Sequence, residues 1–116
     1  MNMEKWLGNE FESSSGLTAE FAKFASDFKK FIKGQLSPDQ CLLVWSRGHF
    51  YVGGFIQQED RFVYFSISDV RHFHNAWYTN VLIRKAKGDR DYTGGQNTYS
   101  HLLDFRKSID YLLREK

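Results

Sequence analysis

The sequence has a single cysteine and no apolar run long enough to span a membrane or to form the core of a signal peptide. A lone cysteine cannot form an internal disulfide, which suits a reducing compartment. Cys41 is followed by the apolar residues 42–44, so we predict a buried and unreactive thiol. A membrane helix needs about 20 consecutive apolar residues. We therefore expect a cytoplasmic protein that has no membrane partner.

The common catalytic and metal-binding signatures are missing as well. The chain has no C-x-x-C, no G-x-S-x-G and no P-loop spacing of glycines before a lysine. His72 and His74 could chelate a metal together with Asp69, His49 or His101, or could act as acid and base in a small hydrolase. An ordinary polar loop explains the pair more simply. We expect no metal and no cofactor, and the sequence favours a binding protein over an enzyme.

The 116 residues suit one domain, and aromatic residues make up 17% of them. Large rings bury much area each, which helps a small chain to form a core. Three runs rich in aromatic and β-branched residues, separated by short polar turns, predict an antiparallel meander. The three strands are expected at residues 41–46, 49–57 and 61–67. The first is nearly all apolar, so it should be buried on both faces. Gly53 and Gly54 in the second predict a bulge or a close backbone approach.

A helix is expected on each side of the meander. Over residues 17–33, phenylalanines recur at spacings of three and four residues, which is typical of an amphipathic helix. We expect a fourth strand at residues 77–85 and a last helix from Asn97 or Thr98 to about Arg114. The predicted core consists of Phe21, Phe24, Phe28, Leu43, Val52, Val63, Phe65, Val81, Leu102, Ile109 and Leu112.

The predicted fold class is therefore α+β, with an antiparallel meander of about four strands and an N-terminal and a C-terminal helix packed on it. Residues 1–16 should form a polar acidic arm before a single domain of residues 17–116. The order of elements is similar to that of Src-homology-2 domains, which hold phosphotyrosine with an arginine in a motif like F-L-V-R-E-S. The corresponding run, L-L-V-W-S-R, places Trp45 at the position of that arginine. The resemblance is thus one of element order, and it does not carry the function over.

The formal net charge is only +2, but it is unevenly distributed. Residues 1–20 carry one lysine and four glutamates, whereas residues 61–90 carry six cations and two aspartates. A local patch of one sign matters more for binding than the total charge. The cations expected to contact a ligand are Arg71, Arg84, Lys85, Lys87 and Arg90.

The loop of residues 88–97 leads into the expected last helix. Gly94 and Gly95 can adopt positive φ angles, and the amides at a helix N-terminus favour an anion. Arginine offers bidentate bonds to phosphate, and Tyr92 could stack on a base. The loop residues expected at the site are Tyr92, Thr93, Gly94, Gly95, Gln96 and Asn97. The alternative interpretation is a plain turn beside an edge strand that its charges protect from pairing.

Together these features predict a small non-enzymatic binding protein that recognises an anionic ligand, either nucleic acid or a phosphate-bearing small molecule. The first alternative is a protein–protein adaptor or inhibitor that uses exposed aromatic residues. The second is a small hydrolase that depends on His72 and His74. The salt dependence of the affinity distinguishes binding to phosphates from binding to a protein partner, because phosphate contacts weaken steeply as ionic strength rises.

Overall fold

The computed structural model describes residues 17–48, 50–70, 81–92, 96–101 and 104–114, without the side chains of residues 17–20. The elements are α1 (Leu17–Gln35), β1 (Gln40–Gly48), β2 (Tyr51–Gln58), β3 (Arg61–Ile67), β4 (Val81–Ala86), β5 (Thr98–Ser100) and α2 (Phe105–Arg114). The strands form one antiparallel sheet in the order β1-β2-β3-β4-β5. The α+β meander with a helix before and after it is confirmed, with five strands where about four were expected. The proposed acidic arm of residues 1–16 and residues 77–80 of the expected fourth strand lie outside the described part.

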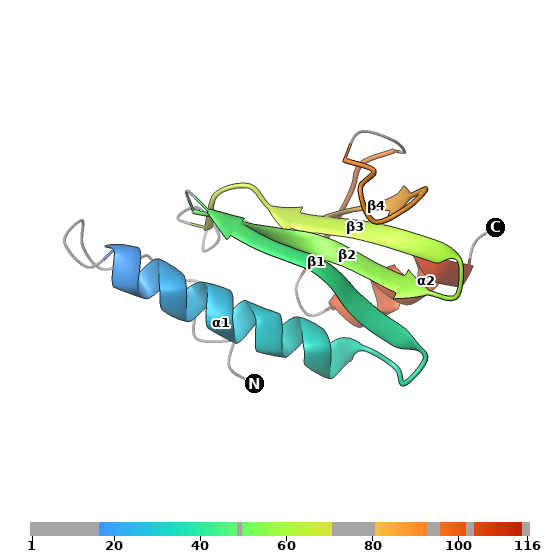
Figure 1. The fold of residues 1–116 in the computed structure, drawn as a ribbon, viewed down its shortest axis with the longest axis horizontal. Coiled ribbons are helices and arrows are strands. Elements are labelled where there is room, and N and C mark those ends of the chain that lie inside the picture. The colour runs from blue at the N-terminus through green and yellow to red at the C-terminus, as the bar shows by residue number, and fades with distance from the viewer. Residues whose placement is uncertain (1–16, 49, 71–80, 93–95, 102–103, 115–116) are drawn as a thin grey trace.

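Both helices pack on the same face of the sheet (Figure 1). Side chains alternate along a strand, so Val63 and Phe65 point to one face of β3 and Tyr64 to the other. The Phe65 ring lies 6.0 Å from the Phe28 ring of α1 and 5.9 Å from the Phe105 ring of α2, measured between centroids. The domain therefore has two layers, and we call the two sides of its sheet the helix-covered face and the helix-free face.

The main core fills the space between the helices and the helix-covered face. Seven of the predicted core residues are buried there: Phe24, Phe28, Val52, Val63, Phe65, Val81 and Ile109. Phe21 and Leu112 pack at its margin, and Leu102 lies outside the described residues. Leu43 was wrongly assigned to this core: it pairs with Phe55, so it belongs to the helix-free face, where it is half-buried.

The predicted start of the last helix is wrong. Residues 98–100 form β5, which pairs with β4 through Val81↔Ser100 and Ile83↔Thr98, and α2 begins only at Phe105. Pairing with β4 gives these residues ladder hydrogen bonds, and a short Thr-Tyr-Ser segment suits a strand. Gln96 and Asn97 therefore precede a strand, and the expected helix N-terminal amides are not found there.

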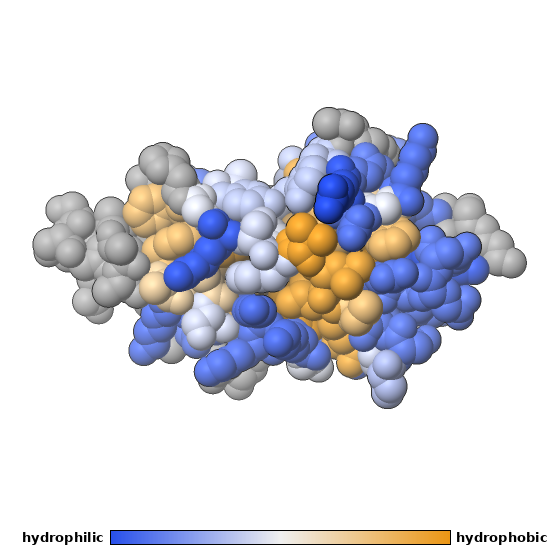
Figure 2. Space-filling model, viewed as in Figure 1, coloured by the Kyte–Doolittle hydropathy of each residue, from blue (hydrophilic) through white to orange (hydrophobic). Residues whose placement is uncertain are grey.

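The prediction that the first strand is buried on both faces is also wrong. β1 is the outer strand of the sheet, its Cys41 is exposed, and Val44 is 42% exposed. Strongly hydrophobic residues gather over this strand at the surface (Figure 2). An apolar run predicts a β-strand, but it does not show whether that strand is central or lies at the edge of the sheet.

The close backbone approach expected at the two glycines is present, and a bulge lies opposite them, with its extra residue in β1 rather than in β2. Leu43 pairs with Phe55 and Ser46 with Gly53, so β1 has one residue more than β2 over this stretch, and Val44 there adopts a φ of 51°. A Cβ atom on Gly54 would lie 3.2 Å from the main-chain oxygen of Leu43, which is tighter than ordinary contact. Glycine lets the two strands approach at the bulge.

Because Cys41 lies on the exposed edge strand, we expect a thiol reagent to modify it in the native protein. The rate should fall within about tenfold of the rate for the urea-unfolded chain, since exposure rather than unfolding then limits the reaction. The measurement is absorbance after mixing with a chromogenic disulfide. Labelling that occurs only as fast as global unfolding would contradict the position of β1 at the edge.

Candidate anion site on the helix-free face

The helix-free face carries a row of side chains from three neighbouring strands. Phe55 of β2 pairs with Tyr64 of β3, and Tyr64 pairs with Arg84 of β4. Residues that pair directly across strands point to the same face. Two aromatic rings and an arginine therefore form a row, with Tyr64 in the middle, on the side of the sheet that neither helix covers.

Arg84 is buried, with 3% of its surface exposed. Its guanidinium carbon lies 4.7 Å from the centroid of the Tyr64 ring, a cation–π contact. Its Nη2 donates to the main-chain oxygen of Asp91 at 2.7 Å. Its Nη1 is buried and has no hydrogen-bond partner among the residues that the structure describes. The buried guanidinium thus keeps an unused donor, and the two groups described in contact with it, the Tyr64 ring and the main-chain oxygen of Asp91, are neutral.

Asp91 closes the turn that covers this arginine. The main-chain nitrogen of Lys87 donates to Asp91 Oδ2 at 2.9 Å, and the nitrogen of Asp91 donates to the oxygen of Gly88 at 3.4 Å. The turn brings Tyr92 onto the sheet, where its ring meets Phe55 at 5.2 Å and Tyr64 at 5.7 Å, both nearly perpendicular. Phe55 is consequently fully buried although no helix lies over it.

The Tyr51 hydroxyl lies 2.9 Å from the Tyr64 hydroxyl on the same face. Burial, followed by the hydrogen bond with Tyr64, raises the pKa of Tyr51 well above its ordinary value of 10.0. The Tyr51 phenol therefore stays neutral at physiological pH and supplies no negative charge to balance Arg84. We name the group of Arg84, Tyr64, Asp91 and Tyr92 the Arg84 site.

The structure brings some of the predicted site residues together and separates others. Arg84 and Tyr92 are both at the Arg84 site, and Lys87 and Arg90 are exposed on the turn that covers it. Lys85 pairs with Val63 and so points to the helix-covered face, where it has an interaction of its own. Gln96 and Asn97 are exposed and lie just before β5. The remaining predicted residues of the anion site lie outside the described part of the chain: Arg71, Thr93, Gly94 and Gly95. The histidines of the metal and hydrolase hypotheses, His49, His72 and His74, lie outside it too.

The predicted site residues did not include Tyr64 and Asp91 of the Arg84 site, nor Phe55 beside it. Tyr64 and Phe55 form the surface on which Arg84 and Tyr92 rest. The alternation within residues 61–67 does place Tyr64 opposite Val63 and Phe65, so a signal existed for it. The pairing of Phe55 with Tyr64 depends on strand register, which the sequence of one strand does not contain.

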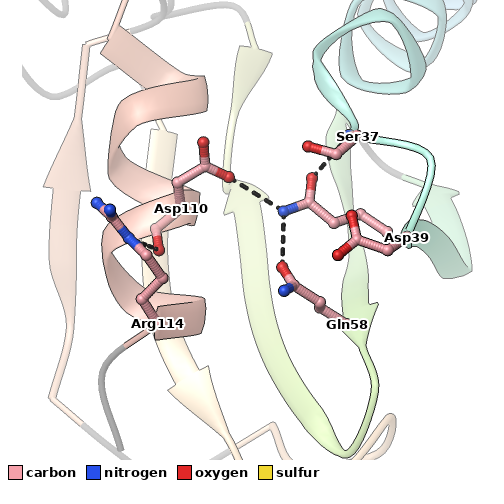
Figure 3. A pocket seen from close by; sticks show the side chains of 6 residues that line it. Ser37, Asp39, Gln58, Asp110 and Arg114 are labelled. Atoms are coloured by element: carbon pink, nitrogen blue, oxygen red, sulfur yellow. Dashed lines mark hydrogen bonds between the residues drawn. The ribbon is translucent and has the colours of Figure 1, made fainter.

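A polar cleft of about 250 Å³ lies elsewhere, where the start of β1 meets the end of β2 and α2 (Figure 3). Gln40 is its buried centre: Oε1 accepts from the Ser37 nitrogen at 2.9 Å, and Nε2 donates to Gln58 Oε1 and Asp110 Oδ1, each at 3.0 Å. The amide of Gln40 is therefore satisfied on both sides. We interpret these hydrogen bonds as a structural network that joins the α1–β1 connection, β2 and α2.

Within the described part of the chain, no group of three or more His, Cys, Asp or Glu residues could hold a metal ion. Among the described helices, none combines the length and the apolar character that crossing a bilayer requires.

Comparison with protein-family models, curated proteins and solved structures finds no match to this chain. We therefore infer its function from the geometry and charge of the site itself.

Proposed function

We propose that the protein binds a phosphate-bearing ligand, either nucleic acid or a phosphorylated small molecule, at the Arg84 site, with Arg84 as the anchor. The observation that supports this proposal is the buried Nη1 of Arg84, which has no partner among the described residues. Buried polar groups in folded proteins are almost always hydrogen-bonded, so an unused donor asks for an explanation. A ligand oxygen at Nη1 would supply the missing bond.

The charge of the site favours an anion. No described carboxylate forms an ion pair with Arg84, and a charge in a poorly polarisable surrounding acts over a longer distance than one in water. Lys87 and Arg90 are exposed on the covering turn, where Asp89 and Asp91 balance their two positive charges, so the net positive charge is that of Arg84. A phosphate at Arg84 would neutralise this surplus charge, and Lys87 and Arg90 could contact its other oxygens.

A phosphate could reach Arg84 by replacing the acceptor of the hydrogen bond between Arg84 Nη2 and Asp91. Its acceptor is a neutral main-chain oxygen rather than a carboxylate. Both bonds have an ionised donor, but phosphate is also an anionic acceptor and therefore adds a Coulombic attraction that the neutral carbonyl lacks. A phosphate oxygen could therefore replace the carbonyl of Asp91, and a small movement of the turn would then expose Nη1 as well. The planar guanidinium would hold two oxygens of the ligand.

A protein partner is the second candidate, and it is supported by a different surface. The edge of β1 presents exposed Cys41 and Val44 within a run that contains no charged residue between Cys41 and Trp45. Unpaired edge strands can accept a strand from another chain. The hydrolase alternative has no such support, because His72 and His74 lie outside the described residues.

The test is a titration of nucleotides, inorganic phosphate and short nucleic acids against the wild type and Arg84→Met. Arg106→Met is the matched control, since Arg106 is an exposed arginine of α2. Losing a charge-assisted hydrogen bond costs about 1.5–3 kcal/mol, so Arg84→Met should bind roughly 10- to 150-fold more weakly. Affinity for the wild type should also fall between 50 and 200 mM salt. If the wild type binds none of these ligands, or if Arg84→Met binds as well as Arg106→Met, the proposal is wrong.

A further inference from the structure

A second exposed tyrosine shares the helix-free face with the Arg84 site. Tyr99 of β5 pairs with Leu82 of β4, and Leu82 is two residues from Arg84, so all three side chains point to the same face. Tyr99 is 54% exposed and Tyr92 is 50% exposed. The described part of the chain has one other tyrosine of similar exposure, Tyr111 of α2.

The two tyrosines lie on opposite sides of the arginine. Tyr92 rests on Phe55 of β2 and Tyr64 of β3, Arg84 belongs to β4, and Tyr99 belongs to β5. Strands are about 4.8 Å apart, so the two rings are separated across the sheet by roughly 12 Å with the guanidinium between them. The order across this face is therefore aromatic ring, cation, aromatic ring.

We propose that the phosphate-bearing ligand is a single-stranded nucleic acid, with one base on Tyr92, another on Tyr99 and an intervening phosphate at Arg84. This inference rests on the proposed function. Aromatic rings on both sides of a cation suit single strands, whose bases are free to stack and whose backbone is charged. A mononucleotide has one base and can use only one of the two rings.

Tyr92 is already ordered for this role. Its contacts with Phe55 and Tyr64 fix the ring, while half of its surface stays open. A ring that is held before binding loses little conformational freedom when a base stacks on it. A duplex would present paired and mutually stacked bases, so it could use the cations of this face but not its rings.

The experiment measures binding by fluorescence anisotropy of four labelled probes at low salt. These are a 12-residue oligodeoxythymidine, the corresponding oligouridine, a duplex of the same length and thymidine monophosphate. The proteins are the wild type, Tyr99→Ser and the control Tyr111→Ser, which also removes an exposed tyrosine. Tyr99 is a better target than Tyr92, because Tyr92 also covers the buried Phe55. Circular dichroism checks that each variant is folded.

We expect the single strands to bind more tightly than the duplex and the monophosphate. A base stacked on an aromatic ring contributes about 1–3 kcal/mol, so Tyr99→Ser should weaken single-strand binding roughly 5- to 150-fold and leave monophosphate binding unchanged. Tyr111→Ser should behave as the wild type. The affinities of the two oligonucleotides show whether the protein prefers DNA or RNA, and a preference for either one supports the inference.

Two other outcomes are distinguishable. If the monophosphate binds to the wild type and Arg84→Met weakens that binding, but single strands bind no more tightly than the duplex or Tyr99→Ser equals Tyr111→Ser, the single-strand inference is overturned and the anion site stands. If no probe binds to the wild type, both proposals are wrong.

Discussion

Replacing Phe28 by alanine should lower the free energy of unfolding by about 3–5 kcal/mol. Phe28 is fully buried, and the rings of Phe24, Phe31, Trp45 and Phe65 lie 6.0–6.4 Å from its own. Residues from α1, β1 and β3 meet at this ring, so the cavity left by alanine cannot close without moving all three elements.

Urea unfolding followed by circular dichroism measures this effect. Lys30→Ala is the control, since Lys30 is an exposed residue of the same helix and alanine suits a helix. We expect the control to change stability by less than about 0.5 kcal/mol. A loss below about 1 kcal/mol for Phe28→Ala would show that the phenylalanine face of α1 does not pack on the sheet, and it would favour a partner-binding helix.

Replacing Arg84 by methionine should raise the stability of the ligand-free protein by about 1–3 kcal/mol, the usual penalty for a buried polar group that lacks a partner. A charge that is buried without a counter-charge opposes folding, and a methionine of similar length fills the same space without it. The change gives up the contact with the Tyr64 ring and the bond to the Asp91 carbonyl, which offset part of the gain.

Urea unfolding in a buffer without phosphate tests this expectation, again with Arg106→Met for comparison. The combination of higher stability and weaker ligand binding is what a functional residue kept at a cost to stability would show. A clear loss of stability for Arg84→Met would mean that the guanidinium is well satisfied in the free protein, and the main support for the anion site would disappear.

Much of the fold follows from local patterns in the sequence. β3 has the predicted bounds because alternation along residues 61–67 is regular, and α1 extends only two residues beyond its predicted end. The errors concern pairing between distant residues. β5 exists because residues 98–100 find a partner in β4, and Cys41 is exposed because no strand lies outside β1.

The candidate site was predictable only in part, for a similar reason. Arg84 and Tyr92 are unusual in their surroundings, one a cation at the end of an apolar strand and the other an aromatic residue in a polar loop. Grouping Lys85 with Arg84 was an avoidable error, since neighbours in a strand point to opposite faces. Placing Tyr99 on the same face as Arg84 needs the register of β4 with β5, which no local pattern contains.

The most direct test of the central claim is the NMR signal of the Arg84 side chain during a titration with a nucleotide or oligonucleotide at low salt. The signal is assigned as the arginine side-chain resonance that is missing from the spectrum of Arg84→Met. We predict that it shifts and saturates with the same dissociation constant as binding, because a phosphate oxygen bonds to the guanidinium. An Arg84 signal that stays in place while the ligand binds, or a protein that binds no phosphate-bearing ligand, would contradict this account.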